Sequence, residues 1–200
     1  MSSIVLDLSP FIQLSDEQFY QLCQNHRDIK FERNASGELI IMPPVGGESG
    51  SREADLITDL TIWNRRTQLG LVFSSSTCFR LPNGANRSPD AAWVAIDRWQ
   101  QLTPEQQKRF PPLCPDFVIE LRSQSDLLQP LQIKMQEYLE NGLRLGWLIN
   151  PQARQIEVYR AHQPRSVLEN PEVLSGEAVL PGFEMSLATL WGPVRIEPLP

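Results

Sequence analysis

Two carboxylates stand out because each lies in or beside an otherwise apolar strand. Residues 116–121 read DFVIEL, an apolar run typical of a central strand, and Glu120 interrupts it. Side chains alternate between the two faces of a strand, so Glu120 shares a face with Arg122. A lone buried carboxylate is costly unless it is paired or binds a metal. The sequence therefore predicts that Glu120 either binds a metal ion or pairs with Arg122.

A second carboxylate begins another apolar run. Asp90 follows Ser88-Pro89 and opens the strand-like segment AAWVAI. Two acids at the ends of sheet strands can converge on one hard divalent cation such as Mg²⁺, which lowers the pKa of a bound water and neutralises charge on a phosphate. A nearby cation would then stabilise the transition state. The alternative is that Asp90 only forms a turn after Ser-Pro.

The elements that must position these acids alternate between helix and strand. Helices are predicted over residues 15–25, 48–66 and 127–141, with a short one starting near Thr103 and a last helical turn near residues 186–190. Strands are predicted in the segments IKFER, ELIIMPP, LVFSSST, FRLPNG, AAWVAI, DFVIEL, LRLGWLIN and QIEVYR, the first two and the last two forming hairpins. The expected fold class is α/β, with a mixed sheet flanked by helices.

Composition sets further limits. The chain has 200 residues and ordinary globular usage, which predicts a single domain with an N-terminal helical extension over 1–28 and a core over 29–191. The N-terminus lacks the pattern of a signal peptide, and no apolar run is long enough to span a bilayer. Three widely spaced cysteines favour a reducing cytoplasm over a disulfide framework. The net charge of −6 argues against tight, non-specific nucleic-acid binding, but a local basic patch with a metal ion can still serve a nuclease.

The two acids and their spacing resemble a known signature. Pro89-Asp90, followed about thirty residues later by Glu120-Leu121-Arg122, is similar to the PD-(D/E)XK nuclease motif, with Arg122 at the position of the motif lysine. The chain resembles more closely the Uma family of restriction-endonuclease-like proteins, from about residue 38 to 191. The stretches that carry this resemblance are ELIIMPPVGGESG, FRLPNGANRSPDAAWV, CPDFVIELRSQSD and KMQEYLENGLRLGWLINP.

The resemblance implies a restriction endonuclease-like core, a divalent metal (Mg²⁺ or Mn²⁺) and hydrolysis of phosphodiester bonds. If the roles of the family's motif residues are carried over to this sequence, Asp90 and Glu120 would bind the metal together with the backbone carbonyl of Leu121. Arg122 cannot deprotonate to act as a base, so it could only bind phosphate or hold Glu120.

The resemblance also extends to the helix after the second acid. Lys134 lies on the rim of its apolar face, one turn before Tyr138. This Lys-x-x-x-Tyr pair resembles the Gln-x-x-x-Tyr motif of some relatives, so we expect Lys134 to replace the motif lysine and Tyr138 to assist it. The alternatives are a rim lysine that only snorkels to solvent and a core tyrosine. An additional acid from the helix over 48–66 would be Glu48 or Glu53, and the sequence leaves that choice open.

These observations support two functions of different kinds. The first is a Mg²⁺-dependent endonuclease whose substrate is duplex DNA. A homodimer is one assembly in which it could act. The alternative is a catalytically degenerate nuclease fold that acts as a nucleic-acid-binding or dimerising module, which Arg122 in the lysine position and the acidic net charge favour.

Overall fold

A six-stranded mixed sheet forms the centre of the molecule, in the order β11-β10-β9-β8-β7-β4. The computed structural model describes residues 3–9 and 11–192. The strands of this sheet are β4 (Gly70–Ser74), β7 (Ala91–Ala95), β8 (Phe117–Leu121), β9 (Leu145–Asn150), β10 (Gln155–Arg160) and β11 (Ser166–Glu169). Strands β8 and β9 are parallel, and their other neighbours in this sheet are antiparallel. The apolar run DFVIEL therefore becomes a central strand, and all five residues of β8 are buried.

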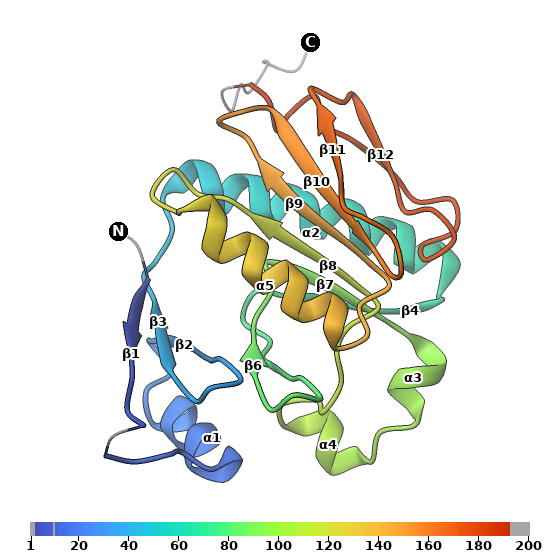
Figure 1. The fold of residues 1–200 in the computed structure, drawn as a ribbon. Coiled ribbons are helices and arrows are strands. Elements are labelled where there is room, and N and C mark those ends of the chain that lie inside the picture. The colour runs from blue at the N-terminus through green and yellow to red at the C-terminus, as the bar shows by residue number, and fades with distance from the viewer. Residues whose placement is uncertain (1–2, 10, 193–200) are drawn as a thin grey trace.

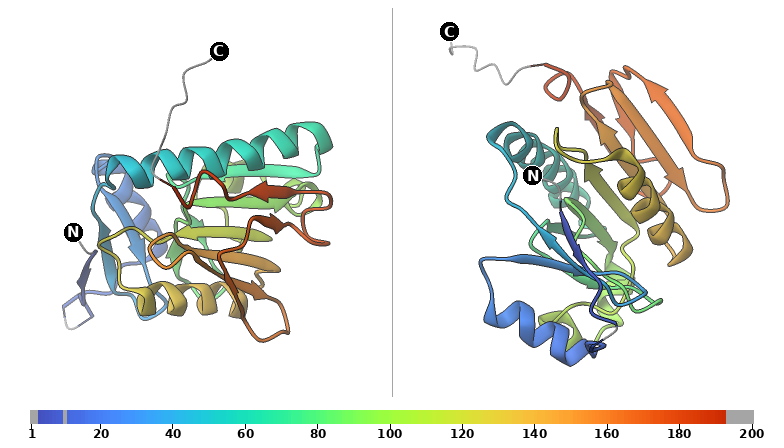
Figure 2. Two further views of the ribbon diagram at one scale, coloured as in Figure 1. Left: turned by 90° about the horizontal axis from the view of Figure 1, so that it is seen from above. Right: turned by 60° about the vertical axis from the view of Figure 1, so that its left-hand side comes forward.

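Helices cover both faces of this sheet. Helix α2 (Gly47–Thr67) lies along one face and helix α5 (Leu128–Glu140) along the other, as Figures 1 and 2 show. Alternation along β8 explains this arrangement, because Phe117 and Ile119 pack on the α2 side and Val118 packs on the α5 side. A hairpin of β12 (Val173–Ser175) and β13 (Glu184–Ser186) shares the α2 side of the core. The expected mixed sheet flanked by helices is confirmed.

A smaller antiparallel sheet lies beside the first, in the order β1-β3-β2-β6-β5. Its strands are β1 (Ile4–Leu6), β2 (Lys30–Arg33), β3 (Leu39–Met42), β5 (Phe79–Arg80) and β6 (Asn86–Arg87). Helix α1 (Asp16–Asn25) packs on it through Phe19, which is fully buried against Phe31 and Leu39. Ser15 caps this helix with a capping box, as its sequence pattern predicts.

The element predictions hold with a few exceptions. Thr103 caps the short helix α4 (Pro104–Lys108) as expected, but the sequence pattern predicts no helix where α3 (Ile96–Gln100) lies. The helical turn predicted near residues 186–190 follows directly after β13, where the Leu187 carbonyl accepts hydrogen bonds of 3.0 Å from the Leu190 amide and 3.3 Å from the Trp191 amide. In the part of the chain that the structure describes, no helix is long and apolar enough to cross a bilayer.

Strands β4 and β7 approach each other closely at Gly70, and this contact can be tested. A Cβ added at Gly70 would lie 2.2 Å from the Val94 carbonyl oxygen and 2.5 Å from Trp93 Cε2. We expect Gly70→Ala to lower the free energy of unfolding by about 2 kcal/mol, because backbone atoms must shift to make room. Urea denaturation gives the difference.

The control for this change is Gly47→Ala, because a Cβ at Gly47 meets nothing within 4 Å. It should leave the midpoint of unfolding nearly unchanged. Equal stability of the two variants would contradict the close packing of β4 on β7.

Candidate active site

Glu120 lies near the end of β8, on the face that α5 covers. Its side chain is 3% exposed. Lys134 Nζ lies 2.8 Å from Glu120 Oε1, and the Tyr138 hydroxyl donates a hydrogen bond of 3.1 Å to the same oxygen. Both partners come from α5, one helical turn apart. The structure therefore brings together Glu120, Lys134 and Tyr138, three residues that the sequence singled out.

Asp90 reaches the same end of β8 from the strand next to it. The antiparallel ladder of β7 and β8 ends at the pair Ala91–Ile119, and in the same register Leu121 would face Pro89. Proline has no amide hydrogen to donate, so the ladder cannot continue there. Instead, Asp90 Oδ2 accepts a hydrogen bond of 2.7 Å from the amide of Leu121. Asp90 is thereby fixed beside the residue that follows Glu120.

A third acid, Glu32, enters the site from the small sheet. It lies on β2 and is 1% exposed. Its Oε1 accepts hydrogen bonds of 2.8 Å from Lys134 Nζ and 2.9 Å from the Ser88 amide. The Lys134 ammonium is thus held between Glu120 and Glu32. Sequence reasoning missed Glu32, because a strand in which Glu32 alternates with Phe31 has the pattern of a strand with one face in solvent.

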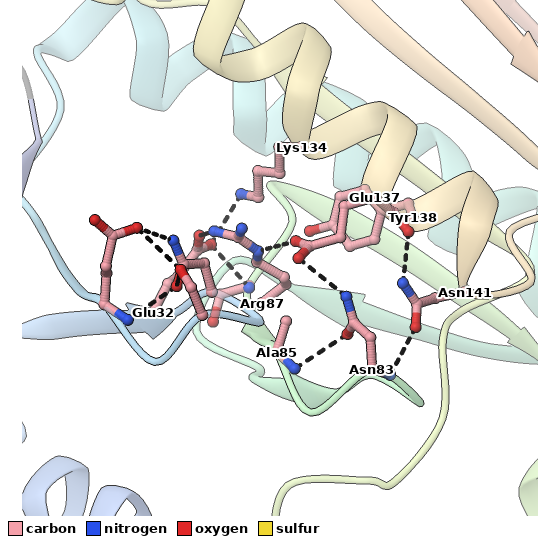
Figure 3. Close-up of polar contacts among 12 residues, drawn as sticks. Glu32, Asn83, Ala85, Arg87, Lys134, Glu137, Tyr138 and Asn141 are labelled. Carbon is pink, nitrogen blue, oxygen red and sulfur yellow. Dashed lines mark hydrogen bonds and ion pairs between the residues drawn. The ribbon is translucent and has the colours of Figure 1, made fainter. Parts of the chain in front are cut away.

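Arg87 extends this network to the other end of α5, as Figure 3 shows. Its Nη1 lies 3.1 Å from Glu32 Oε2, and its Nε donates a hydrogen bond of 2.5 Å to Glu137 Oε2. Asn83 donates to Glu137 as well, and its own amide donates to Asn141 at the C-cap of the helix. The turn between β5 and β6 is therefore tied to α5 on the outer side of the site.

Burial and charge determine the protonation of these groups. Burial raises the pKa of Asp90, and it raises that of Glu120 although Lys134 opposes the shift. For Glu32, burial acts in the same sense, but Lys134 and Arg87 outweigh it and lower the pKa to about 2. Burial disfavours the Lys134 ammonium, yet Glu120 and Glu32 raise its pKa above the usual range. At neutral pH Lys134 is therefore charged and Glu32 is ionised.

The donor set at the strand ends fits a hard divalent cation. In the described part of the chain, Asp90 Oδ1 and Glu120 Oε2 accept no hydrogen bond from the protein, which leaves one oxygen of each carboxylate for a ligand. No three His, Cys, Asp or Glu side chains gather as a metal site among the described residues. A third protein ligand would thus be a backbone oxygen, and Leu121 offers its carbonyl on the side where Pro89 cannot donate to it.

Arg122 does not take part in this cluster. The expected pair with Glu120 is absent from the described contacts, because β8 ends at Leu121 and the chain turns away. The Arg122 guanidinium instead donates hydrogen bonds of 3.0 Å to the Asp126 carbonyl and 3.1 Å to Asn150 Oδ1. Its contacts stabilise the turn before α5 and the end of β9.

Glu48 and Glu53, the two candidates for an additional acid, differ in their surroundings on α2. Glu48 has a 69% exposed side chain and pairs with Arg52 at 3.5 Å. Burial is the main cause that raises the pKa of Asp90, and the Glu53 carboxylate also raises it. The charge of Glu53 therefore acts on Asp90, and the choice of an additional metal-binding acid from α2 stays a prediction.

Comparisons with known proteins identify the family and the fold of the chain. The family described as "Uma2: Putative restriction endonuclease" matches residues 16–188. A crystal structure of a putative nuclease of the DUF820 family from Anabaena variabilis is similar in fold, with 18% sequence identity and a TM-score of 0.70 over 80% of this chain and 89% of that chain. No curated protein matches the chain.

The lowered pKa of Glu32 leads to a prediction on stability. An acid whose pKa is about 2 in the folded state and about 4.3 when unfolded stabilises the fold above pH 4.3, and this contribution is lost as the pH falls toward 2. We expect Glu32→Gln to reduce the free energy of unfolding at pH 7 by on the order of 3 kcal/mol. The deficit should shrink as the pH falls below about 4.3.

Urea denaturation between pH 7 and pH 3 measures this deficit. The exposed Glu140 of α5 provides the control, since Glu140→Gln should follow the wild-type protein at every pH. A deficit that does not change with pH would show that the effect of Glu32→Gln is not electrostatic.

Proposed function

The chain belongs to the Uma2 family of restriction-endonuclease-like proteins, and on that basis we propose that it is a Mg²⁺- or Mn²⁺-dependent endonuclease that hydrolyses phosphodiester bonds in duplex DNA. One observation carries the proposal. Asp90 is fixed on the amide of Leu121, Glu120 precedes that residue, and Lys134 reaches Glu120 from a third element. Two acids and an ammonium thus converge on one end of the central sheet.

Each residue of the cluster has a part in the proposed reaction. Asp90, Glu120 and the Leu121 carbonyl would hold the metal ion, which supplies an activated water and neutralises charge on the phosphate when it is bound. Tyr138 fixes the orientation of Glu120 through its hydroxyl hydrogen bond. Lys134 presents a permanent positive charge beside Glu120, where it can stabilise the additional negative charge of the transition state.

The geometry weakens the main argument for a degenerate, non-catalytic domain. That argument rested on an arginine in the position of the motif lysine. The Lys134 ammonium lies 2.8 Å from Glu120, so the cluster includes a lysine from α5 in place of one on β8. A duplex has two strands to cut, and the proposal includes a homodimer with one site for each strand, which light scattering tests directly.

Removal of the two acids tests the proposed metal site. We expect Asp90→Asn and Glu120→Gln each to reduce Mg²⁺-dependent cleavage of plasmid DNA at least about 100-fold, because the metal loses a charged ligand. Asp90→Asn should unfold no earlier than the wild-type protein, since it removes a carboxylate whose pKa burial raises. Glu120→Gln removes a partner of the buried Lys134 ammonium and should lower the free energy of unfolding, so thermal denaturation must verify that this variant is folded during the assay.

Matched controls are the exposed acids Asp97 and Glu105, whose Asp97→Asn and Glu105→Gln variants should cleave like the wild type. Calorimetry adds a readout independent of cleavage: the wild-type protein should take up Mn²⁺ and the Asp90→Asn, Glu120→Gln double variant should not. Cleavage that survives in the double variant would refute the mechanism.

The roles of Lys134 and Arg122 are separable by substitution. We expect Lys134→Met to abolish cleavage, since it removes the ammonium beside Glu120. Arg122→Lys should retain cleavage within about threefold, because Arg122 contacts Asp126 and Asn150 rather than the acids. Single-turnover rates on a labelled duplex measure both effects, with thermal denaturation as a check on folding. Loss of cleavage in Arg122→Lys, with Lys134→Met active, would reverse the assignment.

A further inference from the structure

Lys30 lies at the edge of the proposed active site. It is the first residue of β2, two positions before Glu32, so both side chains project from the same face of the strand. Glu32 contacts Lys134 inside the site, which places Lys30 on the site side of β2 as well. Lys30 is only partly buried, whereas Glu32 is almost fully enclosed. The strand thus runs from the entrance of the site at Lys30 to its interior at Glu32.

Lys30 differs from the other cations around the site in having no bound partner. Lys134 lies between Glu120 and Glu32, and Arg87 lies between Glu32 and Glu137. Within the described residues, Lys30 has no ion pair and no side-chain hydrogen bond. The charges of the inner cations are thus taken up by protein carboxylates, while that of Lys30 is available to a ligand.

The charge of Lys30 nevertheless acts on the acids of the site. Burial raises the pKa of Asp90, and Lys30 is the foremost charge that opposes this shift. Burial acts on Glu32 too, where Lys30 joins Lys134 and Arg87 in lowering the pKa. The Lys30 charge therefore acts on Asp90 and Glu32 without an ion pair to either, in keeping with its place on the same face of β2 as Glu32.

A polyanion that approaches these acids meets an unfavourable field. The chain carries a net charge of −6, and the site itself contributes several carboxylates. A phosphodiester needs a positive group that is both close to the acids and not already neutralised. We propose that Lys30 binds a backbone phosphate of the nucleic acid at the entrance of the site, next to the bond that is cut. This inference rests on the proposed function, since it names the contact by which that same site holds its substrate.

The chain offers a matched control, because its lysines are Lys30, Lys108 and Lys134. Lys108 is exposed on α4, away from the acid cluster. The experiment measures the affinity for a fluorescent DNA duplex by anisotropy, with Mg²⁺ present and in a Glu120→Gln background that leaves the duplex uncut. Lys30→Gln, Lys30→Arg and Lys108→Gln are each added to this parent protein, and thermal denaturation verifies that each is folded.

We expect Lys30→Gln to weaken binding about tenfold, the typical effect of losing one charge-assisted phosphate contact. The slope of log Kd against log salt concentration should fall by about one, as it does when one phosphate contact is lost. Lys30→Arg should keep most of the affinity, and Lys108→Gln should bind like the parent. A lysine that only lowers repulsion among the acids would leave the salt slope unchanged.

The outcomes separate this inference from the proposed function. If the wild type cleaves DNA and Lys30→Gln binds like Lys108→Gln, the role of Lys30 is refuted and the nuclease stands. If the parent binds the duplex and Lys30→Gln weakens it, yet the wild type cleaves nothing, the phosphate contact stands and the nuclease activity is refuted. A parent protein that binds no duplex overturns both.

Discussion

The Lys134 ammonium is held between two buried carboxylates, and most of the site depends on this contact. The charges of Lys134, Glu120 and Glu32 are all buried, and the burial of any one of them alone would be strongly unfavourable. The fold tolerates them only while they remain together. Glu120 comes from the large sheet, Glu32 from the small sheet, and Lys134 from the helix that packs over them. The same ion pairs therefore fix the helix on its sheet and the two sheets against each other.

The rest of the site follows from how this cluster is enclosed. Arg87 balances the second oxygen of Glu32 and links it to Glu137, so the far side of α5 is tied down as well. Pro89 ends the ladder between β7 and β8 beside Leu121. The backbone groups of Leu121 therefore have no ladder partner on the β7 side at the point where the acids meet. These contacts would hold the proposed catalytic groups in place before a substrate arrives, and such preorganisation is how electrostatic catalysis lowers a barrier.

Local sequence patterns were sufficient for part of this site. Glu120 was predictable because a charge in an apolar strand needs a partner, whereas Lys134 was singled out by the resemblance of its Lys-x-x-x-Tyr pair to a motif of some nucleases. Glu32 was not, because its contact with Lys134 joins residues 102 positions apart across two sheets. The alternation of side chains predicted that Arg122 shares a face with Glu120. This alternation holds only inside a strand, and β8 ends at Leu121, one residue before Arg122. Helix α3 was missed for a similar reason, since a helix of little more than one turn depends on tertiary contacts more than on pattern.

The separation between the members of the cluster also determines when the site can exist. Asp90 and the Leu121 amide are 31 positions apart, whereas Lys134 and Glu32 are 102 positions apart. Contacts between distant segments form late on average, because closing the long loop between them costs conformational entropy before the contact is gained. During synthesis the acids leave the ribosome before α5, so a growing chain has the carboxylates without the ammonium that holds them. An incomplete chain therefore has no assembled site, so under the proposed nuclease function unfinished copies would be unable to cut nucleic acid.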